Sequence, residues 1–246
     1  MPTNLFDLNG KAALVTGGAT GIGKGIATLY AKNGANIILA ARRENLLEEA
    51  TNELRQFGTK IHFVVTDVTN EQDVKHLFSK TLSEFGQLDI LVNNSGVAAG
   101  GPIEDIELDT WLNVINVNLT GVFLCTREAM RIMKKQNQGR IINIGSISAQ
   151  MPRMNSAPYT SSKHGLVGLT KSTALEGREY GVSAGCLHPG NTESDLLLSG
   201  IGSSKEPMMS VNEIASAALT MASLPPNANM LEAIVLPVKQ KYVGRG

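Results

Sequence analysis

The segment from Lys11 to Gly34 constrains the fold of this chain more than any other. It begins with a short apolar run, Lys11–Thr16, which indicates a strand buried on both faces. The glycine-rich turn Gly17–Gly23 follows, and then an apolar-periodic stretch that ends at Gly34 and indicates a helix. Backbone amides at the start of a helix, together with the helix dipole, attract a phosphate. A strand, a glycine turn and a helix in this order predict a dinucleotide-binding α/β fold.

The strand expected at Asn36–Ala41 bears on the type of dinucleotide. In folds of this kind an acidic residue about 20 positions after the glycines binds the adenosine ribose and selects NAD. That position is Ala41 here, and Arg42 and Arg43 follow it directly. A guanidinium fits a 2′-phosphate by its charge and its forked donors, so we predict NADP(H) as the cofactor in preference to NAD(H). The alternative is that both arginines solvate the start of the next helix.

A second motif combines a serine, a tyrosine and a lysine. Ser146 follows an apolar run, and Tyr159 and Lys163 lie one turn apart on a helix that Ser156 and Pro158 are expected to begin. A free phenol exchanges protons poorly at neutral pH, but a nearby ammonium favours the phenolate and makes the hydroxyl a better acid–base group. Ser146 would hold a substrate oxygen that gains charge in the transition state. Without the serine, the tyrosine–lysine spacing alone would favour an exposed aromatic–lysine pair on a helix.

These motifs together resemble those of the classical short-chain dehydrogenase/reductase family. The resemblance extends from about Leu8 to Asn191 and includes Asn93-Asn94-Ser95-Gly96, where the family usually has Asn-Asn-Ala-Gly. It implies an oxidoreductase that acts on CH–OH groups with NAD(P) as acceptor. In this family a hydride passes between the nicotinamide and a carbonyl or secondary alcohol substrate, and an NADP(H) cofactor favours carbonyl reduction as the working direction.

The resemblance assigns catalytic roles to Asn118, Ser146, Tyr159 and Lys163. Tyr159 would be the general acid/base, Lys163 would assist it and hold the nicotinamide ribose, and Ser146 would position the substrate oxygen. Asn118 would hold a water that relays protons to Lys163. Taken alone, Asn118 is equally compatible with a solvated residue or a helix-cap remnant, because asparagine is a poor helix former.

The resemblance also implies which residues bind the cofactor. Asp67 would bond the adenine amino group, although a simple turn aspartate is the alternative. The backbone after the Pro189–Gly190 turn would meet the nicotinamide carboxamide, and the sequence leaves open whether Thr192 or Ser194 also contacts it. The complete expected set is Gly17, Thr20, Gly21, Ile22, Gly23, Arg42, Arg43, Asp67, Val68, Asn94, Gly96, Tyr159, Lys163, Pro189, Gly190 and Thr192.

The fold class that follows is α/β. We expect a single, doubly wound Rossmann-type domain over residues 1–246, with a seven-stranded parallel sheet whose order, 3-2-1-4-5-6-7, is implied by the resemblance. Thr69 and Gln72 form a capping-box signature for one of the helices. A long helix is expected from Leu108 to about Lys135, and in the family this helix and the one carrying Tyr159 form a subunit interface, which implies a homodimer or homotetramer. Residues at about 191–210 are rich in glycine and serine and are expected to form a substrate lid.

Composition argues against several other classes of protein. The chain has 22 basic and 22 acidic residues, which gives no indication of a nucleic-acid or membrane partner. No secretory signal and no membrane-spanning segment are expected. Cys125 and Cys186 lie far apart and outside any metal-ligand spacing, so we expect packed thiols, a cytoplasmic protein and no metal site.

Two other functions stay open at this point. A 3-oxoacyl-(acyl-carrier-protein) reductase needs basic residues near the pocket mouth, and Arg127, Arg131, Lys134 and Lys135 lie along one predicted helix, although such a run is usually a solvated face. The tail 237–246 resembles instead the ending of family members that act on small 3-hydroxy acids. A non-catalytic dinucleotide-binding sensor typically lacks the tyrosine or the lysine, whereas this chain has both. The identity of the substrate is not indicated, because a family of this kind carries many activities on one fold.

Overall fold

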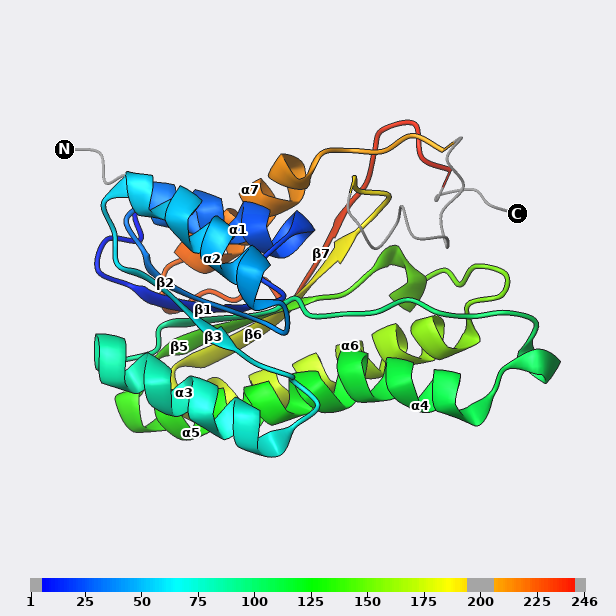
Figure 1. Cartoon of the computed structure of the whole chain (residues 1–246), viewed down its shortest axis with the longest axis horizontal. Helices are drawn as coiled ribbons and strands as arrows, with labels where there is room; N and C mark the ends of the chain where they lie inside the picture. The colour runs from blue at the N-terminus through cyan, green and yellow to red at the C-terminus, as the bar shows by residue number, and fades with distance from the viewer. Residues whose placement is uncertain (1–5, 194–205, 242–246) are drawn as a thin grey trace.

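The computed structural model describes residues 6–193 and 206–241 and has three layers, with a parallel sheet between two layers of helices (Figure 1). The strands are β1 (Ala12–Thr16), β2 (Asn36–Ala41), β3 (Ile61–Val65), β4 (Ile90–Asn93), β5 (Gly139–Ile144), β6 (Val182–Pro189) and β7 (Glu232–Val235). They form a seven-stranded sheet in the order β3-β2-β1-β4-β5-β6-β7, and each adjacent pair is parallel. The doubly wound fold and the strand order are therefore confirmed.

Helices cover both faces of this sheet. They are α1 (Gly21–Lys32), α2 (Glu44–Leu54), α3 (Glu71–Phe85), α4 (Leu108–Ile115), α5 (Gly121–Gln136), α6 (Ala157–Gly177) and α7 (Val211–Ser223). In Figure 1, α1, α2 and α7 lie over one face, and α3, α4, α5 and α6 lie over the other. The lid expected at about 191–210 lies mainly outside the described residues, because 194–205 are not among them.

Successive residues of the central strands contribute to two different apolar cores. Ala13 and Val15 of β1 pack in the cluster that contains Ile26 of α1, whereas Leu14, between them, packs in the cluster that contains Leu77 of α3. Side chains of a strand alternate between the two faces of the sheet, so a strand covered on both faces must be apolar throughout. This explains why the strands appear in the sequence as continuous apolar runs.

The long helix expected from Leu108 to about Lys135 is interrupted by a π-helical turn. Residues Asn116–Thr120 form this turn between α4 and α5, and Asn118 lies in its middle. The side chain of Asn118 is completely buried, so the alternative of a solvated residue is wrong. Single π-helical turns inside α-helices are rare, and those that occur are often found at functional sites.

One predicted helix start differs from the structure. Asn70, not Thr69, caps α3, and its side chain accepts hydrogen bonds from the backbone amides of Gln72 and Asp73. The Thr69 hydroxyl instead donates a hydrogen bond of 2.7 Å to Asp67. Both residue types favour the cap position, and the turn that Asp67 forms decides which of them occupies it.

Arg140 of β5 connects the sheet to the end of α7. It is only 9% exposed, and its guanidinium donates hydrogen bonds of 3.0–3.4 Å to the carbonyl oxygens of Leu224, Pro225 and Ala228. Burial lowers the pKa of this guanidinium from its ordinary value. Its charge faces the carbonyl end of α7, where the helix dipole is negative and the last carbonyl groups have no partner within the helix.

Replacing Arg140 by methionine is therefore expected to lower the free energy of unfolding by about 1–3 kcal/mol, because three part-buried carbonyl groups lose their donor. Urea unfolding at a fixed protein concentration measures the change. Arg55→Met is the matched control, since among the described residues the exposed guanidinium of Arg55 bonds only the side chain of Asn52, at 2.9 Å. This control is expected to leave stability nearly unchanged. Equal stability of the Arg140 variant and the control would show that this contact contributes nothing.

Candidate active site

A cavity of about 510 Å³ lies at the carboxyl ends of the strands. Its lining includes residues that follow the last residue of β1, β2, β3, β4, β5 and β6, so it spans the point between β1 and β4 where the strand order reverses. Open α/β sheets bind their ligands at this point. Sixteen of the residues expected to form the site line this cavity: Gly17, Thr20, Gly21, Ile22, Arg42, Arg43, Asp67, Val68, Asn94, Gly96, Ser146, Tyr159, Lys163, Pro189, Gly190 and Thr192.

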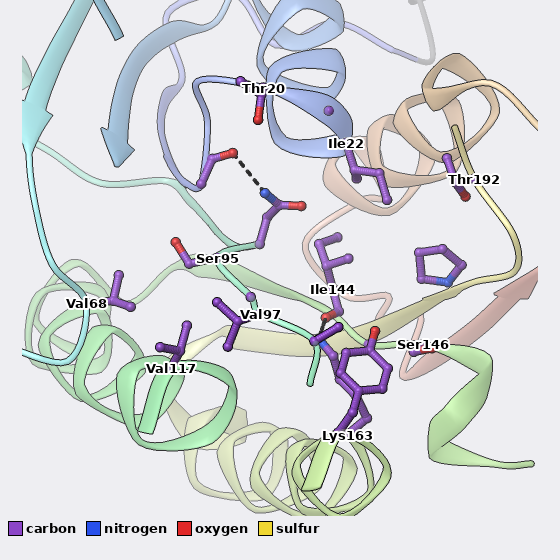
Figure 2. A pocket seen from close by; sticks show the side chains of 18 of the residues that line it. Thr20, Ile22, Val68, Ser95, Val97, Val117, Ile144, Ser146, Lys163 and Thr192 are labelled. Carbon is purple, nitrogen blue, oxygen red and sulfur yellow. Dashed lines mark hydrogen bonds between the residues drawn. The ribbon is translucent and has the colours of Figure 1, made fainter. Parts of the chain in front are cut away.

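The glycine turn between β1 and α1 forms one wall of the cavity (Figure 2, Thr20 and Ile22). Thr20 precedes α1 without capping it, and the first turn of α1 contains no acidic residue. Gly17 has a φ of +62°, and a Cβ atom there would lie only 2.8 Å from the amide nitrogen of Asn94. Gly23 does not line the cavity, and a Cβ atom there would overlap the carbonyl oxygen of Gly17. The turn thus leaves the start of α1 open to an anion, as the fit of a dinucleotide phosphate requires.

Asn94 fixes this turn to the next strand of the sheet. Its side-chain amide donates hydrogen bonds of 3.1 Å to the carbonyl oxygen of Thr16 and 3.0 Å to that of Gly17. The Thr16 hydroxyl accepts hydrogen bonds from the backbone amides of Asn94 and Ser95, at 3.0 and 3.1 Å. The serine that replaces the usual alanine at position 95 leaves this arrangement intact, because only its backbone takes part.

Two cations stand at the end of the cavity next to β2. Arg42 and Arg43 are exposed and line the cavity beside Ala41. Neither guanidinium forms a hydrogen bond or an ion pair with the residues that the structure describes. Free guanidinium groups and the lack of a carboxylate at Ala41 fit a phosphate better than two ribose hydroxyl groups.

Asp67 and Val68 line the cavity at the end of β3. The carboxylate of Asp67 accepts hydrogen bonds from the backbone amide and the hydroxyl of Thr69, at 2.9 and 2.7 Å. The turn role considered for Asp67 is thus present in the structure. The contact with an adenine amino group stays a prediction.

The serine, the tyrosine and the lysine of the second motif line the same cavity (Figure 2, Ser146 and Lys163). Lys163 of α6 is 5% exposed, and its ammonium donates a hydrogen bond of 2.8 Å to the carbonyl oxygen of Ile144. The same nitrogen lies 5.6 Å from the ring centroid of Tyr159. Among the described residues no carboxylate pairs with it, so a buried positive charge faces the tyrosine.

Ser146 begins a short 3₁₀ turn, Ile147–Ala149, directly after β5. Its hydroxyl oxygen accepts a hydrogen bond of 3.1 Å from the backbone amide of Ser148. That bond uses a lone pair and leaves the hydroxyl proton free to donate. At the start of α6, Ser156 precedes the helix as predicted, but its hydroxyl bonds the carbonyl oxygen of Arg153 and the hydroxyl of Thr160 instead of a backbone amide.

Asn118 does not line the cavity and lies behind its wall. Its side-chain oxygen accepts a hydrogen bond of 2.8 Å from the Val97 amide, and its nitrogen donates to the Val97 carbonyl oxygen and the Ser162 hydroxyl at 2.9 and 3.1 Å. A methyl group on Gly96 would lie 3.5 Å from the side-chain oxygen of Asn118 and 4.0 Å from the ammonium of Lys163. The missing side chain at Gly96 therefore keeps open a space that borders both residues.

The turn after β6 closes the other side of the cavity. Pro189, Gly190 and Thr192 line it, and the hydroxyl of Thr192 donates a hydrogen bond of 3.1 Å to the carbonyl oxygen of Gly190. Ser194, the other candidate for the nicotinamide contact, lies outside the described residues. Gln240 holds this turn through a hydrogen bond of 2.9 Å from the Asn191 amide to its side-chain oxygen.

The sequence analysis did not identify Arg153 as part of the site. Its guanidinium lines the cavity and donates a hydrogen bond of 2.7 Å to the side-chain oxygen of Asn191. It also lies 3.2 Å from a carboxylate oxygen of Glu206. The side-chain amide of Asn191 donates a hydrogen bond of 2.7 Å to the same oxygen. The one signal in the sequence is the position of Arg153 between Ser146 and Tyr159, two residues that line the same cavity.

Other reactive groups take no part in this cavity. Burial raises the pKa of both the Cys125 and the Cys186 thiol to about 12, which matches the expectation of packed thiols. In the two described ranges, no group of three metal-ligating side chains is close enough to hold an ion. None of the helices among these residues has both the length and the apolarity needed to cross a membrane.

Comparison with known proteins identifies the family. The family model described as short chain dehydrogenase matches residues 11–200. An uncharacterized oxidoreductase of Bacillus subtilis (strain 168), YxjF, is 40% identical over 187 residues, which are 76% of this chain and 73% of the relative.

Two solved structures share the fold over nearly their whole length. The alcohol dehydrogenase from the archaeon Thermococcus sibiricus, complexed with 5-hydroxy-NADP, has a TM-score of 0.88 at 27% identity and covers 94% of this chain and 98% of its own. The 3-ketoacyl-(acyl-carrier-protein) reductase from Brucella melitensis, complexed with NADH, has a TM-score of 0.87 at 28% identity, with coverages of 94% and 98%. The sequence match, the fold and the cavity agree, and the chain is an oxidoreductase of the short-chain dehydrogenase/reductase family.

Proposed function

We propose that this enzyme is an NADP(H)-dependent reductase of small carbonyl compounds, with Tyr159 as its general acid/base. One observation carries the proposal: Ser146, Tyr159 and Lys163 line the same cavity as the glycine turn and two arginines that have no partner among the described residues. A dinucleotide whose phosphates lie at the start of α1 has its adenosine end toward Arg42 and Arg43. Its other end then lies toward the serine, the tyrosine and the lysine.

Each of the cavity residues has a separate role in the reduction of a carbonyl substrate. When bound, a reduced nicotinamide supplies the hydride that the carbonyl carbon accepts. The Ser146 hydroxyl donates a hydrogen bond to the carbonyl oxygen, where negative charge develops, and Tyr159 delivers its proton to that oxygen. The Lys163 ammonium, 5.6 Å from the ring, attracts the negative charge left on the phenolate oxygen. The space beside Gly96, which borders Asn118 and Lys163, suits a water that returns a proton to this side of the site.

The preference for NADP(H) rests on the residues beside β2. The guanidinium groups of Arg42 and Arg43 have no partner in the part of the chain that the structure describes, and Ala41 offers no carboxylate to ribose hydroxyl groups. The two related structures described above bind dinucleotides of either type, so the family alone leaves the choice between them open. The residues at positions 41–43 of this chain favour the phosphorylated cofactor.

The substrate class is tested by following the absorbance of NADPH, and in parallel of NADH, with ketones, 3-oxo esters, 3-oxo acids and a 3-oxoacyl thioester carried by acyl carrier protein. We expect oxidation of NADPH with at least one small carbonyl compound, and slower oxidation of NADH. Binding of NADPH without oxidation by any compound would replace the proposal with that of a non-catalytic dinucleotide-binding sensor.

A 3-oxoacyl-(acyl-carrier-protein) reductase is less well supported. Arg127 forms an ion pair of 2.8 Å with Glu71, and Arg131 forms one of 2.7 Å with Glu128, so each guanidinium already lies against a carboxylate of this chain. Lys134 lies 4.7 Å from the ring centroid of Tyr180. Turnover confined to the protein-bound thioester, with a KM raised only for that substrate by Arg127→Glu, would instead favour this function.

We infer that the enzyme is a homodimer or homotetramer that pairs through α5 and α6. Two large apolar side chains on these helices are exposed, Phe123 at 45% and Leu175 at 62%. A groove of about 810 Å³ that includes Phe123, Leu169 and Tyr180 lies between the same helices. Light scattering of the purified protein gives the mass, and a monomer at micromolar concentration would contradict this inference.

A further inference from the structure

A completely buried histidine lies next to Ser146. His188 of β6 has no exposed surface, and its Nδ1 atom lies 2.9 Å from the carbonyl oxygen of Ser146 and 3.4 Å from the backbone nitrogen of the same residue. A Cβ atom on Gly145 would lie only 2.6 Å from Nδ1, so the glycine is what permits this approach. His188 does not line the cavity. The ring therefore supports the backbone of Ser146 from outside the cavity.

The other ring nitrogen faces a carboxylate of the edge strand β7. Nε2 lies 3.3 Å from Oε1 of Glu232, yet it forms no aligned hydrogen bond. Oε1 of Glu232 accepts a hydrogen bond of 2.7 Å from the Gln150 side chain, and Oε2 lies 3.7 Å from the ammonium of Lys171. Gln150 ends the short turn that Ser146 begins. Glu232 thus contacts this turn at its end directly and at its beginning through His188.

These contacts select one protonation state of the ring. Burial lowers the pKa of His188 below its ordinary value of 6.5, and the charge of Lys163 acts in the same direction, while the hydrogen bond to Ser146 and the carboxylate of Glu232 oppose them. The thiol of Cys186, the other titratable group near the ring, is protonated because burial raises its pKa to about 12. A neutral imidazole carries one N–H group. On Nδ1 this group donates to the carbonyl oxygen of Ser146 at 2.9 Å, a shorter contact than the 3.4 Å at which Nδ1 would accept from the Ser146 amide in the other tautomer.

We propose that His188 is a positioning residue for Ser146, with the ring held in turn by Glu232, and the proposal rests on the catalytic role proposed above for Ser146. The Nδ1–H group fixes the carbonyl of Ser146 at the start of the turn, which sets the direction of its hydroxyl in the cavity. A purely packing role does not account for these contacts. Burying a polar ring is costly unless it is hydrogen-bonded, and the shortest polar contact of this ring among the described residues is the one from Nδ1 to the carbonyl oxygen of Ser146.

Three variants test the proposal. His188→Asn keeps an N–H donor near the position of Nδ1, His188→Gln moves the donor toward the position of Nε2, and His188→Leu removes it. We expect His188→Leu to lower kcat by about 100-fold, the scale of a misplacement of about 1 Å in a catalytic group, without changing the dissociation constant of NADPH. His188→Asn is expected to recover most of this loss, and His188→Gln little of it.

The control is Ser146→Ala, which removes the hydroxyl that His188 is proposed to position. If Ser146→Ala is inactive and His188→Leu turns over like the wild type, the positioning role is overturned and the proposed function stands. If Ser146→Ala itself keeps full activity, the proposed function fails. Should His188→Leu not fold, the asparagine and glutamine variants decide, and equal kcat values for these two would overturn the proposal.

A titration tests the neutral ring separately. Because the pKa of folded His188 is lowered, unfolding takes up a proton between pH 6.5 and the lower folded value. The stability contributed by the neutral ring is therefore present above pH 6.5 and is lost as the pH falls through the folded pKa. His188→Asn is expected to remove this acid dependence, whereas an unchanged dependence would show that the ring is already charged in the folded enzyme. The ring nitrogen signals in NMR spectra, assigned by comparison with His188→Asn, give the tautomer directly.

Discussion

Replacing Tyr159 by phenylalanine is expected to lower kcat for carbonyl reduction by about 10²–10⁴-fold, the usual contribution of a general acid/base. The phenylalanine ring occupies the same part of the cavity wall, and the ammonium of Lys163 still lies near its face, as it lies 5.6 Å from the ring centroid of Tyr159 now. Only the hydroxyl and its proton are removed. The affinity for NADPH and the KM of the carbonyl substrate should therefore change little.

Single-turnover measurements with NADPH separate the chemical step from cofactor binding, which fluorescence titration of the same variant gives. The chain offers a matched control in Tyr180→Phe. Tyr180 also has a lysine over its ring, with Lys134 4.7 Å from the centroid, but it lies outside the cavity. We expect the control to keep wild-type turnover. A Tyr159→Phe enzyme with most of its activity would remove the proposed mechanism.

The parts of the site that the sequence predicted share one property: each depends on residues close together in the chain. The glycine turn after β1, the pair Arg42 and Arg43 after β2, and the one-turn spacing of Tyr159 and Lys163 are local patterns with a local physical cause. Their convergence at one edge follows from the parallel sheet, since all strands end on the same side. The strand order itself came from the resemblance to a family and not from these patterns.

The parts that the sequence did not predict depend on packing between distant segments. The resemblance named Asn118 as a site residue but did not indicate its burial. A π-helical turn directs its side chain to Val97 and Ser162, and no periodicity in the sequence indicates such a turn. His188 meets Ser146 across two neighbouring strands, 42 positions apart in the chain. Such contacts become visible only when the register of β5 against β6 is known.

Removing the charge of Arg42 and Arg43 together is expected to have the second-largest effect on the enzyme. A hydrogen bond to a charged group contributes about 1.5–3 kcal/mol, so loss of the contact with a 2′-phosphate should lower kcat/KM for NADPH by about 10- to 150-fold. The Arg42→Ala, Arg43→Ala double variant should leave kcat/KM for NADH nearly unchanged, because NADH has no phosphate there. Adding Ala41→Asp should then raise kcat/KM for NADH, since a carboxylate at this position accepts hydrogen bonds from the ribose hydroxyl groups.

The ratio of the two kcat/KM values, measured at low and at moderate salt, distinguishes this role from a general effect of surface charge. A phosphate contact predicts that the salt dependence seen with NADPH disappears in the double variant, because the exposed charges that salt screens are gone. Arg55→Ala is the matched control, for it removes an exposed guanidinium that lies outside the cavity. If the double variant keeps the NADPH preference of the wild type, the two arginines only solvate the start of α2, and cofactor choice must then be attributed to other residues of the cavity.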